Sequence, residues 1–421
     1  MNKYLKLSIP FFSILSFLFV SCRMDEQQDF ADLMVDQEGR RESIGRIDQY
    51  GVSPFAETRL ALDDAEMNKI APSNDYTFDF FRKSYEEGKN MLLCPLGFQM
   101  TLAMTGNIAN DSDNVCRMIG FEGEGINDVN TYFMHLLGSL SGDSLGKELK
   151  LANAFMTDIR AKKYPDSFLN VLESNYLADY YEIEAKSLEE QPCGSRPEDA
   201  WCKEKTAGMI DVAPFPIMEY ESSILNVFSF AGEWQDKFDK DLTKNDWFYV
   251  KPEVETPLSF MNKQCNINYY ENDDFRAVSL PFSEGVFDLS IILPKTRFDV
   301  AGVLEQLDSD VWDAMRTGFG KKEIKLSVPL FSASYSKKMK IGFPLIEGVT
   351  PLDEIGQKSL FQMNEEGASA SAVTQGHIAI LDPSRISNIE KFFANNPFIY
   401  TISESGSGLI LFIGTYCGAD K

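Results

Sequence analysis

Histidine is almost absent from this chain, since only His135 and His377 occur among its 421 residues. A Ser-His-Asp triad or a Cys-His pair requires a histidine close to the nucleophile. We expect His135 on a helix face and His377 in a loop. The HExxH zinc motif, the phosphate-binding loop and the dinucleotide fingerprint are also missing from the sequence. We therefore expect a protein that is not an enzyme and that needs no cofactor or metal ion.

Basic residues are few compared with acidic ones. The chain has 40 Lys and Arg against 64 Asp and Glu, which gives a formal net charge of −24 at pH 7. Proteins that bind nucleic acids neutralise the backbone phosphates with Lys and Arg, so this balance argues against a nucleic-acid partner. Hydrophobic residues make up 44% of the chain, which argues against disorder over its whole length.

The N-terminus has a hydrophobic run that is too short to cross a membrane as a helix. The run extends from Leu7 to Val20, whereas a membrane-spanning helix needs about 20 apolar residues. Lys3 and Lys6 precede the run and small residues follow it, which is the order of an export signal. We therefore predict that residues 1–21 are a signal peptide.

The end of this segment, Phe19-Val20-Ser21-Cys22, resembles the processing site of bacterial lipoproteins. The resemblance implies that Cys22 becomes the lipidated N-terminus and anchors the protein to a membrane. Asp25-Glu26 resembles the acidic tag that some envelope lipoproteins carry for export to the outer face. We expect a lipid-anchored protein of the bacterial cell envelope, held at the outer membrane with a route to the cell surface.

Positions 22–73 are polar and acidic and show no sustained apolar period. We expect them to form a tether between the anchor and the folded part of the chain. The folded domain is predicted to comprise residues 74–421. Apolar spacing within it predicts helices over 75–85, 91–108, 164–176 and 301–315 and a strand over 324–335.

A regular pattern of small residues follows Glu365-Glu366-Gly367. Every second position is small and uncharged: Ala368, Ala370, Ala372, Thr374 and Gly376. Ser369, Ser371 and Val373 lie between them and would line the opposite face of a strand. Such alternation suits a segment that must enter a sheet over a packed core, because a large inward side chain costs roughly 1–3 kcal/mol. The alternative interpretation is an Ala/Ser-rich linker.

Three other stretches carry recognisable motifs. They are Asn90-Met91-Leu92-Leu93-Cys94-Pro95-Leu96-Gly97, the Trp201-x-x-x-Lys205-Thr206-x-Gly208-x-Ile210 segment, and Asn226-x-x-x-Phe230-x-Gly232-x-Trp234-x-x-x-Phe238. Together with Asn364-Glu365-Glu366-Gly367, these resemble motifs of the serpin family of serine protease inhibitors, in the family's order. The resemblance covers residues 74–418, and with the N-terminal signal it indicates a bacterial lipoprotein-type member.

The resemblance implies the α+β serpin fold. That fold has a large central mixed or antiparallel β-sheet, additional sheets, about eight to nine helices and an exposed reactive-centre loop. In this chain the loop would occupy about residues 366–395, with Glu365 to Thr374 as its hinge. Trp234 would lie at the breach, where the loop first enters the sheet.

The resemblance also implies a shutter beneath the sheet, formed by Cys94, Gly97, Asn226 and Gln357. Cys94 and Gly97 stand where the family has serines, which puts the usual shutter hydrogen bonds in doubt. Gln357 falls where many members have a histidine, and its amide can still donate and accept.

The implied function is inhibition of serine endopeptidases, and also of cysteine endopeptidases, by a suicide-substrate mechanism. The target cleaves the loop and forms an acyl-enzyme, residues 368–376 insert into the large sheet as a new strand, and the protease is trapped covalently. The partners are therefore a target endopeptidase and, through Cys22, a membrane, and the protein is expected to be a monomer.

The family commonly has its scissile residue fourteen positions after the hinge glycine, which here gives the bond Leu381-Asp382. Leucine at that position favours chymotrypsin-like or elastase-like targets. The loop is longer than in common members, so Ile380 and the bond Arg385-Ile386, which would suit a trypsin-like target, remain alternatives.

A second interpretation is a non-inhibitory serpin-fold protein that acts as a binding module at the cell surface. The altered shutter favours it, whereas the alternation of small residues favours insertion and hence inhibition.

Overall fold

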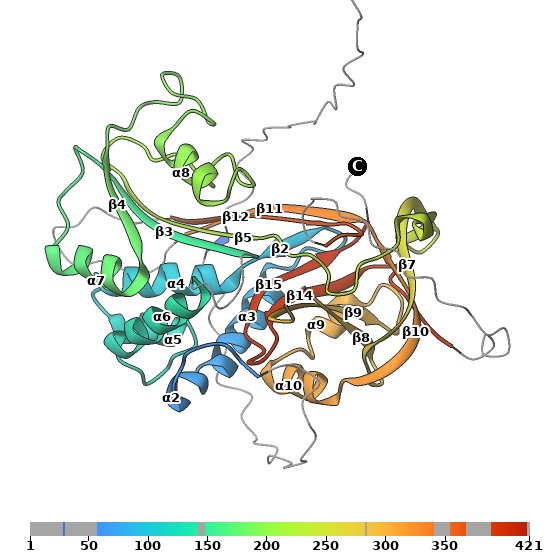
Figure 1. The fold of residues 1–421 in the computed structure, drawn as a ribbon. Helices are drawn as coiled ribbons and strands as arrows, with labels where there is room; N and C mark the ends of the chain where they lie inside the picture. Colours follow the sequence, from blue (N-terminus) through green and yellow to red (C-terminus); the bar gives the residue numbers. More distant parts are fainter. Residues whose placement is uncertain are drawn as a thin grey trace, which may run out of the picture.

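Figure 1 shows the computed structural model of the chain, in which helices and β-sheets form an α+β arrangement. The structure describes residues 28–29, 57–141, 148–282, 284–340, 354–367 and 389–418. The predicted signal peptide, Cys22 and most of the tether lie outside the described residues. So do the following hinge and scissile-bond candidates: Ala368, Ser369, Ala370, Ser371, Ala372, Val373, Thr374, Ile380, Leu381, Asp382, Arg385 and Ile386.

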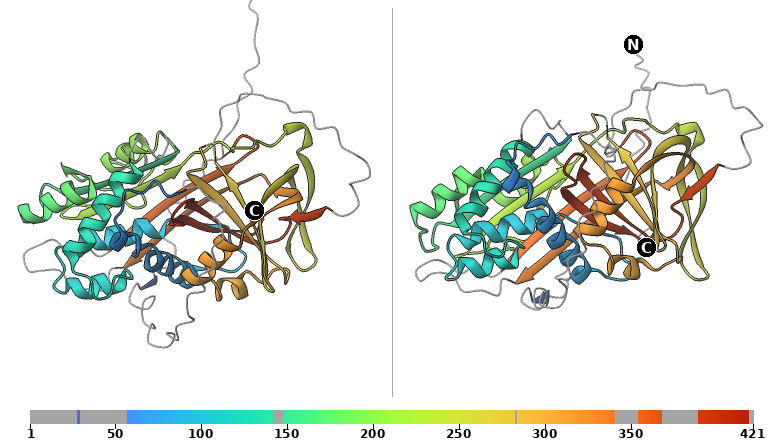
Figure 2. Two further views of the ribbon diagram at one scale, coloured as in Figure 1. Left: turned by 60° about the horizontal axis from the view of Figure 1, so that its bottom comes forward. Right: turned by 90° about the horizontal axis from the view of Figure 1, so that it is seen from below.

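The helices of the N-terminal half gather at one end of the molecule, as Figure 2 shows in blue to green. The described α-helices are α2 Asp64–Met67, α3 Ile70–Ser84, α4 Pro95–Gly106, α5 Ser112–Met118, α6 Ile126–Leu140, α7 Asp166–Tyr176, α8 Pro197–Lys205, α9 Val300–Leu304 and α10 Ser309–Gly318. Every residue of α4 is buried, because α3, α5 and α6 contact it as well as strands β5, β12 and β15. Within the described ranges no helix is long and apolar enough to cross a membrane.

The largest sheet has nine strands in the order β13-β10-β7-β8-β9-β14-β15-β2, with β6 paired to β7. Their bounds are β2 Met91–Leu93, β6 Lys244–Lys251, β7 Val254–Glu271, β8 Phe275–Pro281, β9 Phe287–Pro294, β10 Gly320–Pro329, β13 Glu390–Phe393, β14 Phe398–Glu404 and β15 Ile410–Tyr416. All neighbours are antiparallel except β10 and β13, so the sheet is mixed. Strands β9, β14 and β15 are buried at every position and form the centre of the core.

Two three-stranded sheets complete the fold, in the orders β4-β3-β5 and β1-β11-β12. Their strands are β1 Gln28–Asp29, β3 Leu149–Asp158, β4 Ala178–Ile183, β5 Ser222–Phe230, β11 Phe331–Lys340 and β12 Glu354–Met363. Strands β5 and β12 are the neighbours where these sheets meet, and both contact α4 (Figure 1). The α+β class with a large mixed sheet and additional sheets is therefore confirmed.

Two predicted helices are interrupted. Over 91–108 the prediction was wrong at its start, because Met91–Leu93 form strand β2 and α4 begins only at Pro95. A residue before proline is disfavoured in helical conformation, and Cys94 has φ −115° and ψ 82°. Residues 301–315 are divided between α9 and α10, since the Asp308 carboxylate caps α10 by accepting from the Val311 N–H at 2.8 Å.

The ordered structure also extends further towards the N-terminus than residue 74. Helix α3 begins at Ile70, and both Ile70 and Leu60 belong to the hydrophobic core. The packed part of the chain thus includes residues that the sequence assigned to the tether. The strand predicted over 324–335 is in fact the junction of β10 and β11, two strands of different sheets.

Candidate functional site

The chain reverses direction immediately after β12. The Asn364 N–H donates to the Gly367 carbonyl at 2.9 Å, and the Gly367 N–H donates back to the Asn364 carbonyl at 3.2 Å. The Asn364 side-chain oxygen also accepts from the N–H groups of Glu366 and Gly367. These hydrogen bonds make Asn364 to Gly367 a tight turn in which Gly367 lies opposite Asn364.

Gly367 can hold this conformation because it lacks a side chain. Its φ of +149° lies in the region that residues with a Cβ rarely adopt. A Cβ would also lie only 2.1 Å from the Gly232 carbonyl oxygen. The backbone of Gly367 instead pairs with Glu233 in an antiparallel bridge, which joins the turn to the chain that follows β5.

Trp234 holds the turn in place with two hydrogen bonds. Its backbone N–H donates to the Glu366 carbonyl at 2.8 Å, and its indole N–H donates to the Asn364 carbonyl at 2.8 Å. The indole is buried and stacks on Phe282 with ring centroids 4.7 Å apart. The Phe238 N–H adds a hydrogen bond to the Glu365 carbonyl at 3.0 Å. The structure thus brings Trp234 and the described hinge residues together.

Two lysines hold the Glu366 carboxylate. Lys240 lies 3.0 Å and Lys237 lies 3.1 Å from its oxygens, and the side chain is 11% exposed. The hydrogen bonds from Lys240 and Lys237 lower the pKa of Glu366 below its ordinary value. Glu233 and Glu366 in turn raise the pKa of Lys237. Neither lysine was singled out by a motif, so these ion pairs could not be predicted from the sequence.

A seam between two sheets begins at this turn. Strand β5 ends one three-stranded sheet and β12 ends the other. Within the described residues no ladder of backbone hydrogen bonds joins the two strands, although they are neighbours. Strand edges of this kind present N–H and C=O groups to any further strand. The edges beside the hinge therefore belong to the two smaller sheets, and not to the nine-stranded sheet.

Gln357 lies halfway along β12 and holds the backbone that precedes α4. Its amide oxygen accepts from the Cys94 N–H at 2.7 Å, and its amide nitrogen donates to the Cys94 carbonyl at 2.7 Å. Gln357 is 6% exposed and Cys94 is fully buried. One amide thus satisfies the buried Cys94 N–H and adds a second hydrogen bond to the Cys94 carbonyl, which also accepts from the Gly97 N–H at 2.9 Å. Burial also raises the pKa of the Cys94 thiol well above its ordinary value.

Gly97 leaves room for this arrangement. A Cβ at Gly97 would lie 2.4 Å from the Asn226 side-chain oxygen and 2.9 Å from the Gln357 amide nitrogen. Asn226 donates to Asn153 at 2.5 Å across the β3–β5 pair, so its position is fixed from the other side. The four predicted shutter residues therefore lie together under the seam, and Asn153 is a further member that the motifs did not reveal.

The serpin family model (serine protease inhibitor) matches residues 71–418. The chain belongs to the serpin family. A leukocyte elastase inhibitor of Xenopus tropicalis is 25% identical over 83% of this chain and 99% of its own length. An uncharacterized serpin-like protein of Thermococcus kodakarensis is 24% identical over 87% of this chain and 89% of its own length.

Solved serpin structures share the fold. Tengpin, a thermophilic serpin in the native state, gives a TM-score of 0.73 at 23% identity and covers 86% of this chain and 96% of its own. Thyroxine-binding globulin in complex with thyroxine gives 0.70 at 17% identity, covering 84% and 100%. The serpin fold expected from the motifs is therefore confirmed. Membership of the family supports protease inhibition in general. Serpins act on proteases as inhibitors rather than as catalysts.

Proposed function

We propose that this serpin inhibits serine endopeptidases, and also cysteine endopeptidases, as a suicide substrate. The target cleaves the reactive-centre loop, and residues 368–376 then enter the seam between β5 and β12 as a new strand. The acylated protease is carried along and trapped covalently. The observation that supports this most strongly is the Asn364–Gly367 turn at the head of the seam, where Gly367 pairs with Glu233 on one side and with Asn364 on the other.

The existing pairs fix the register that insertion would take. Gly367 opposes Glu233 on one side and Asn364 on the other. If both antiparallel pairings continue without a bulge, Ala370 falls between Phe230 and Phe361, and Thr374 falls between Asn226 and Gln357. Thr374 of the inserted strand would thus lie between two shutter residues.

This register places the small residues over the core. The Phe230 ring contacts Phe282, and the Phe361 ring contacts Phe331, so the side chains at this level point inward. Ala370 shares their face, and by alternation so do the other small members, Ala368, Ala372 and Thr374. Alternate positions of β12 point the other way, and Gln362 is exposed there. The sequence pattern and the seam therefore fit each other without overpacking.

Insertion would release enough free energy to deform a protease. Roughly 10–15 new backbone hydrogen bonds at about 0.5–1.5 kcal/mol each give on the order of 10 kcal/mol. That is comparable with the whole stability of a typical domain. The free energy would come from pairing the edges of β5 and β12, between which the described residues form no ladder.

We place the scissile bond at Leu381-Asp382, with Ile380 and Arg385-Ile386 as alternatives. A leucine before the cleaved bond suits chymotrypsin-like and elastase-like targets, and a similar protein is named for inhibiting leukocyte elastase. Incubation with each protease, followed by sequencing of the new N-terminus, decides among the bonds. A complex that survives boiling in detergent is the expected product.

Ala368→Arg tests insertion directly. An arginine facing the core at the entrance of the seam should stop the strand from entering, so the variant should be cleaved as a substrate and form no stable complex. Ser369→Arg is the matched control, because the same side chain then points outward and inhibition should persist. Equal inhibition by Ala368→Arg and wild type would contradict the mechanism.

The second candidate is a binding protein without inhibitory activity. Its support is the similarity in fold to thyroxine-binding globulin and the altered shutter residues Cys94 and Gly97. Such a protein would be cleaved by elastase or chymotrypsin without a stable complex, and Ala368→Arg and Ser369→Arg would behave alike.

A further inference from the structure

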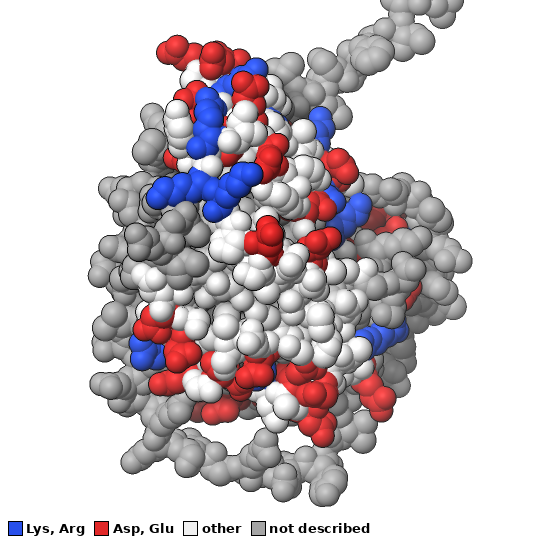
Figure 3. Space-filling model, turned by 90° about the vertical axis from the view of Figure 1, so that its left-hand side faces the viewer, with Lys and Arg blue, Asp and Glu red and all other residues white. Residues whose placement is uncertain are grey.

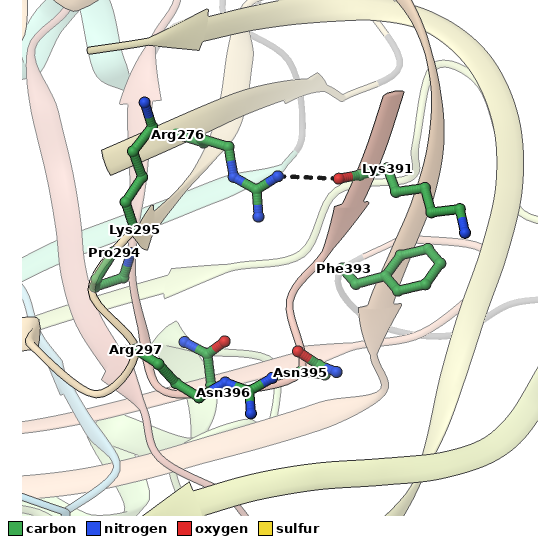
Figure 4. Close-up of a pocket in the computed structure, with 8 residues that line it drawn as sticks. All are labelled: Arg276, Pro294, Lys295, Arg297, Lys391, Phe393, Asn395 and Asn396. Carbon is green, nitrogen blue, oxygen red and sulfur yellow. Dashed lines mark hydrogen bonds between the residues drawn. The ribbon is translucent and has the colours of Figure 1, made fainter. Parts of the chain in front are cut away.

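A cleft with a volume of about 350 Å³ opens where β13 passes the ends of β8 and β9. Figure 4 shows the eight residues that line it: Arg276, Pro294, Lys295, Arg297, Lys391, Phe393, Asn395 and Asn396. This volume is at the lower end of the range for small-molecule sites, roughly 300–1,000 Å³. The described lining contains no residue of β10, of the hinge or of the shutter.

The lining of this cleft opposes the charge of the whole protein. Four of the eight lining residues are basic and none is acidic, in a chain with a formal net charge of −24. The face in Figure 3 is different, since Lys and Arg lie there beside Asp and Glu. Two of the basic residues pair with carboxylates outside the lining: Glu271 lies 2.7 Å from Lys295, and Glu390 lies 3.7 Å from Arg276. The interior therefore attracts anions.

Two guanidinium groups are held in place on opposite sides of the cleft. Arg276 donates to the Lys391 carbonyl at 3.1 Å, and Figure 4 shows its guanidinium reaching across towards β13. Arg297 lies over the ring of Tyr249, with 4.4 Å from its guanidinium carbon to the ring centroid. The Tyr249 N–H donates to the Asn395 carbonyl at 2.8 Å, which ties this stack to the other wall. Guanidinium groups fixed in this way lose little freedom on binding.

The other lining residues suit the uncharged organic part of an anionic ligand. Pro294 and Asn396 are buried and form the floor. The amides of Asn395 and Asn396 offer donors and acceptors. The Phe393 ring is 39% exposed and lies on the β13 wall in Figure 4, where it can cover an apolar sugar face.

We propose that this cleft binds a phosphate or sulfate monoester of about the size of a monosaccharide. Arg276 and Arg297 bind the oxyanion with bidentate hydrogen bonds, which match guanidinium geometry. The two asparagines bind hydroxyl groups, and Phe393 covers the ring. Because the basic groups come from β8, the chain after β9 and β13, the ligand fastens β13 to the rest of the nine-stranded sheet.

A ligand that holds β13 against the rest of the sheet should change the hydrogen exchange of this strand. Among the residues that the structure describes, this strand has four residue pairs, all with β10, and lies at the edge of its sheet. An anion bound from both sides should protect its amides against hydrogen exchange. The proposal does not depend on protease inhibition, since both binding and exchange are measured on the intact protein without a protease.

The test is isothermal titration of the full-length protein with glucose 6-phosphate, glucose 6-sulfate, orthophosphate and, as the uncharged control, glucose. We expect both esters to bind, orthophosphate to bind more weakly and glucose not to bind. The stronger ester identifies the source of the anion. Affinity should fall with rising salt, because the contact is between charged groups.

Arg297→Gln should weaken ester binding at least tenfold, and Phe393→Ala should weaken the esters but not orthophosphate. Arg117→Gln, an equal change of charge on helix α5, is the matched control and should leave binding unchanged. Protection of the β13 amides should rise on addition of ester to wild type and to Arg117→Gln, but not to Arg297→Gln. No heat of binding for either ester, or equal losses in Arg297→Gln and Arg117→Gln, would overturn the proposal.

Discussion

Gln357 shows how one side chain can replace a set of others. The family places serines where this chain has Cys94 and Gly97, and the expectation was that the shutter hydrogen bonds would suffer. The structure instead has the Gln357 amide pairing with both polar groups of the Cys94 backbone. Gly97 provides the space, since any Cβ there would collide with Asn226.

Gln357→Ala should therefore destabilise the protein by about 1–3 kcal/mol, because it leaves the buried Cys94 N–H without a partner, while the Cys94 carbonyl still accepts from the Gly97 N–H. Gln362→Ala is the matched control, since Gln362 is an exposed amide on the same strand, and its cost should be within about 0.5 kcal/mol. Urea unfolding of both variants measures the difference. Similar midpoints for the two would show that the amide contributes nothing to the shutter.

The hinge is an element whose stability should depend on pH. Lys240 and Lys237 lower the pKa of Glu366 in the folded protein below its ordinary value of 4.5. A lowered carboxyl pKa gives stability that is fully present above the unfolded pKa and is lost as pH falls through the folded pKa. The ion pairs should thus hold the turn at neutral pH and release it in acid.

Glu366→Gln removes these ion pairs with little change of shape. At pH 7 the variant should melt below wild type, and the difference should shrink as pH falls below about 4.5 towards 3, where wild type loses the same charge. Differential scanning calorimetry across this range measures the gap. A constant gap at all pH values would mean that the carboxylate charge has no part in holding the hinge.

Part of the hinge and shutter geometry could be predicted from the sequence. The features that were predicted wrongly or not at all have physical causes. The hinge, breach and shutter residues were assigned from the family resemblance. The described ones lie together, and their roles in insertion stay predictions. Apolar periodicity could not separate β2 from α4, because buried strands and buried helices are equally hydrophobic, and only Pro95 marks the boundary. The ion pairs of Glu366 join segments that are far apart in the sequence, so no local sequence pattern predicts them.

At the scale of the whole molecule, the seam between β5 and β12 explains how a folded protein can still gain free energy by inserting a further strand. Among the described residues, β5 and β12 each have a ladder on one side only, and both contact the buried helix α4. The small residues after Gly367 match the side-chain positions that a seam strand would occupy. The loop and the scissile bond lie outside the described residues, so only their chemistry, and not their placement, supports the choice of target.

The melting temperature of the cleaved protein tests the central claim most directly. The loop is cut between residues 377 and 388 by a protease that the protein does not inhibit, and the melting temperatures of intact and cleaved samples are compared. If residues 368–376 fill the seam, the cleaved form should melt higher by on the order of 20 °C, and the inserted peptide should resist further digestion. An unchanged melting temperature, with that peptide still open to a second protease, would contradict insertion.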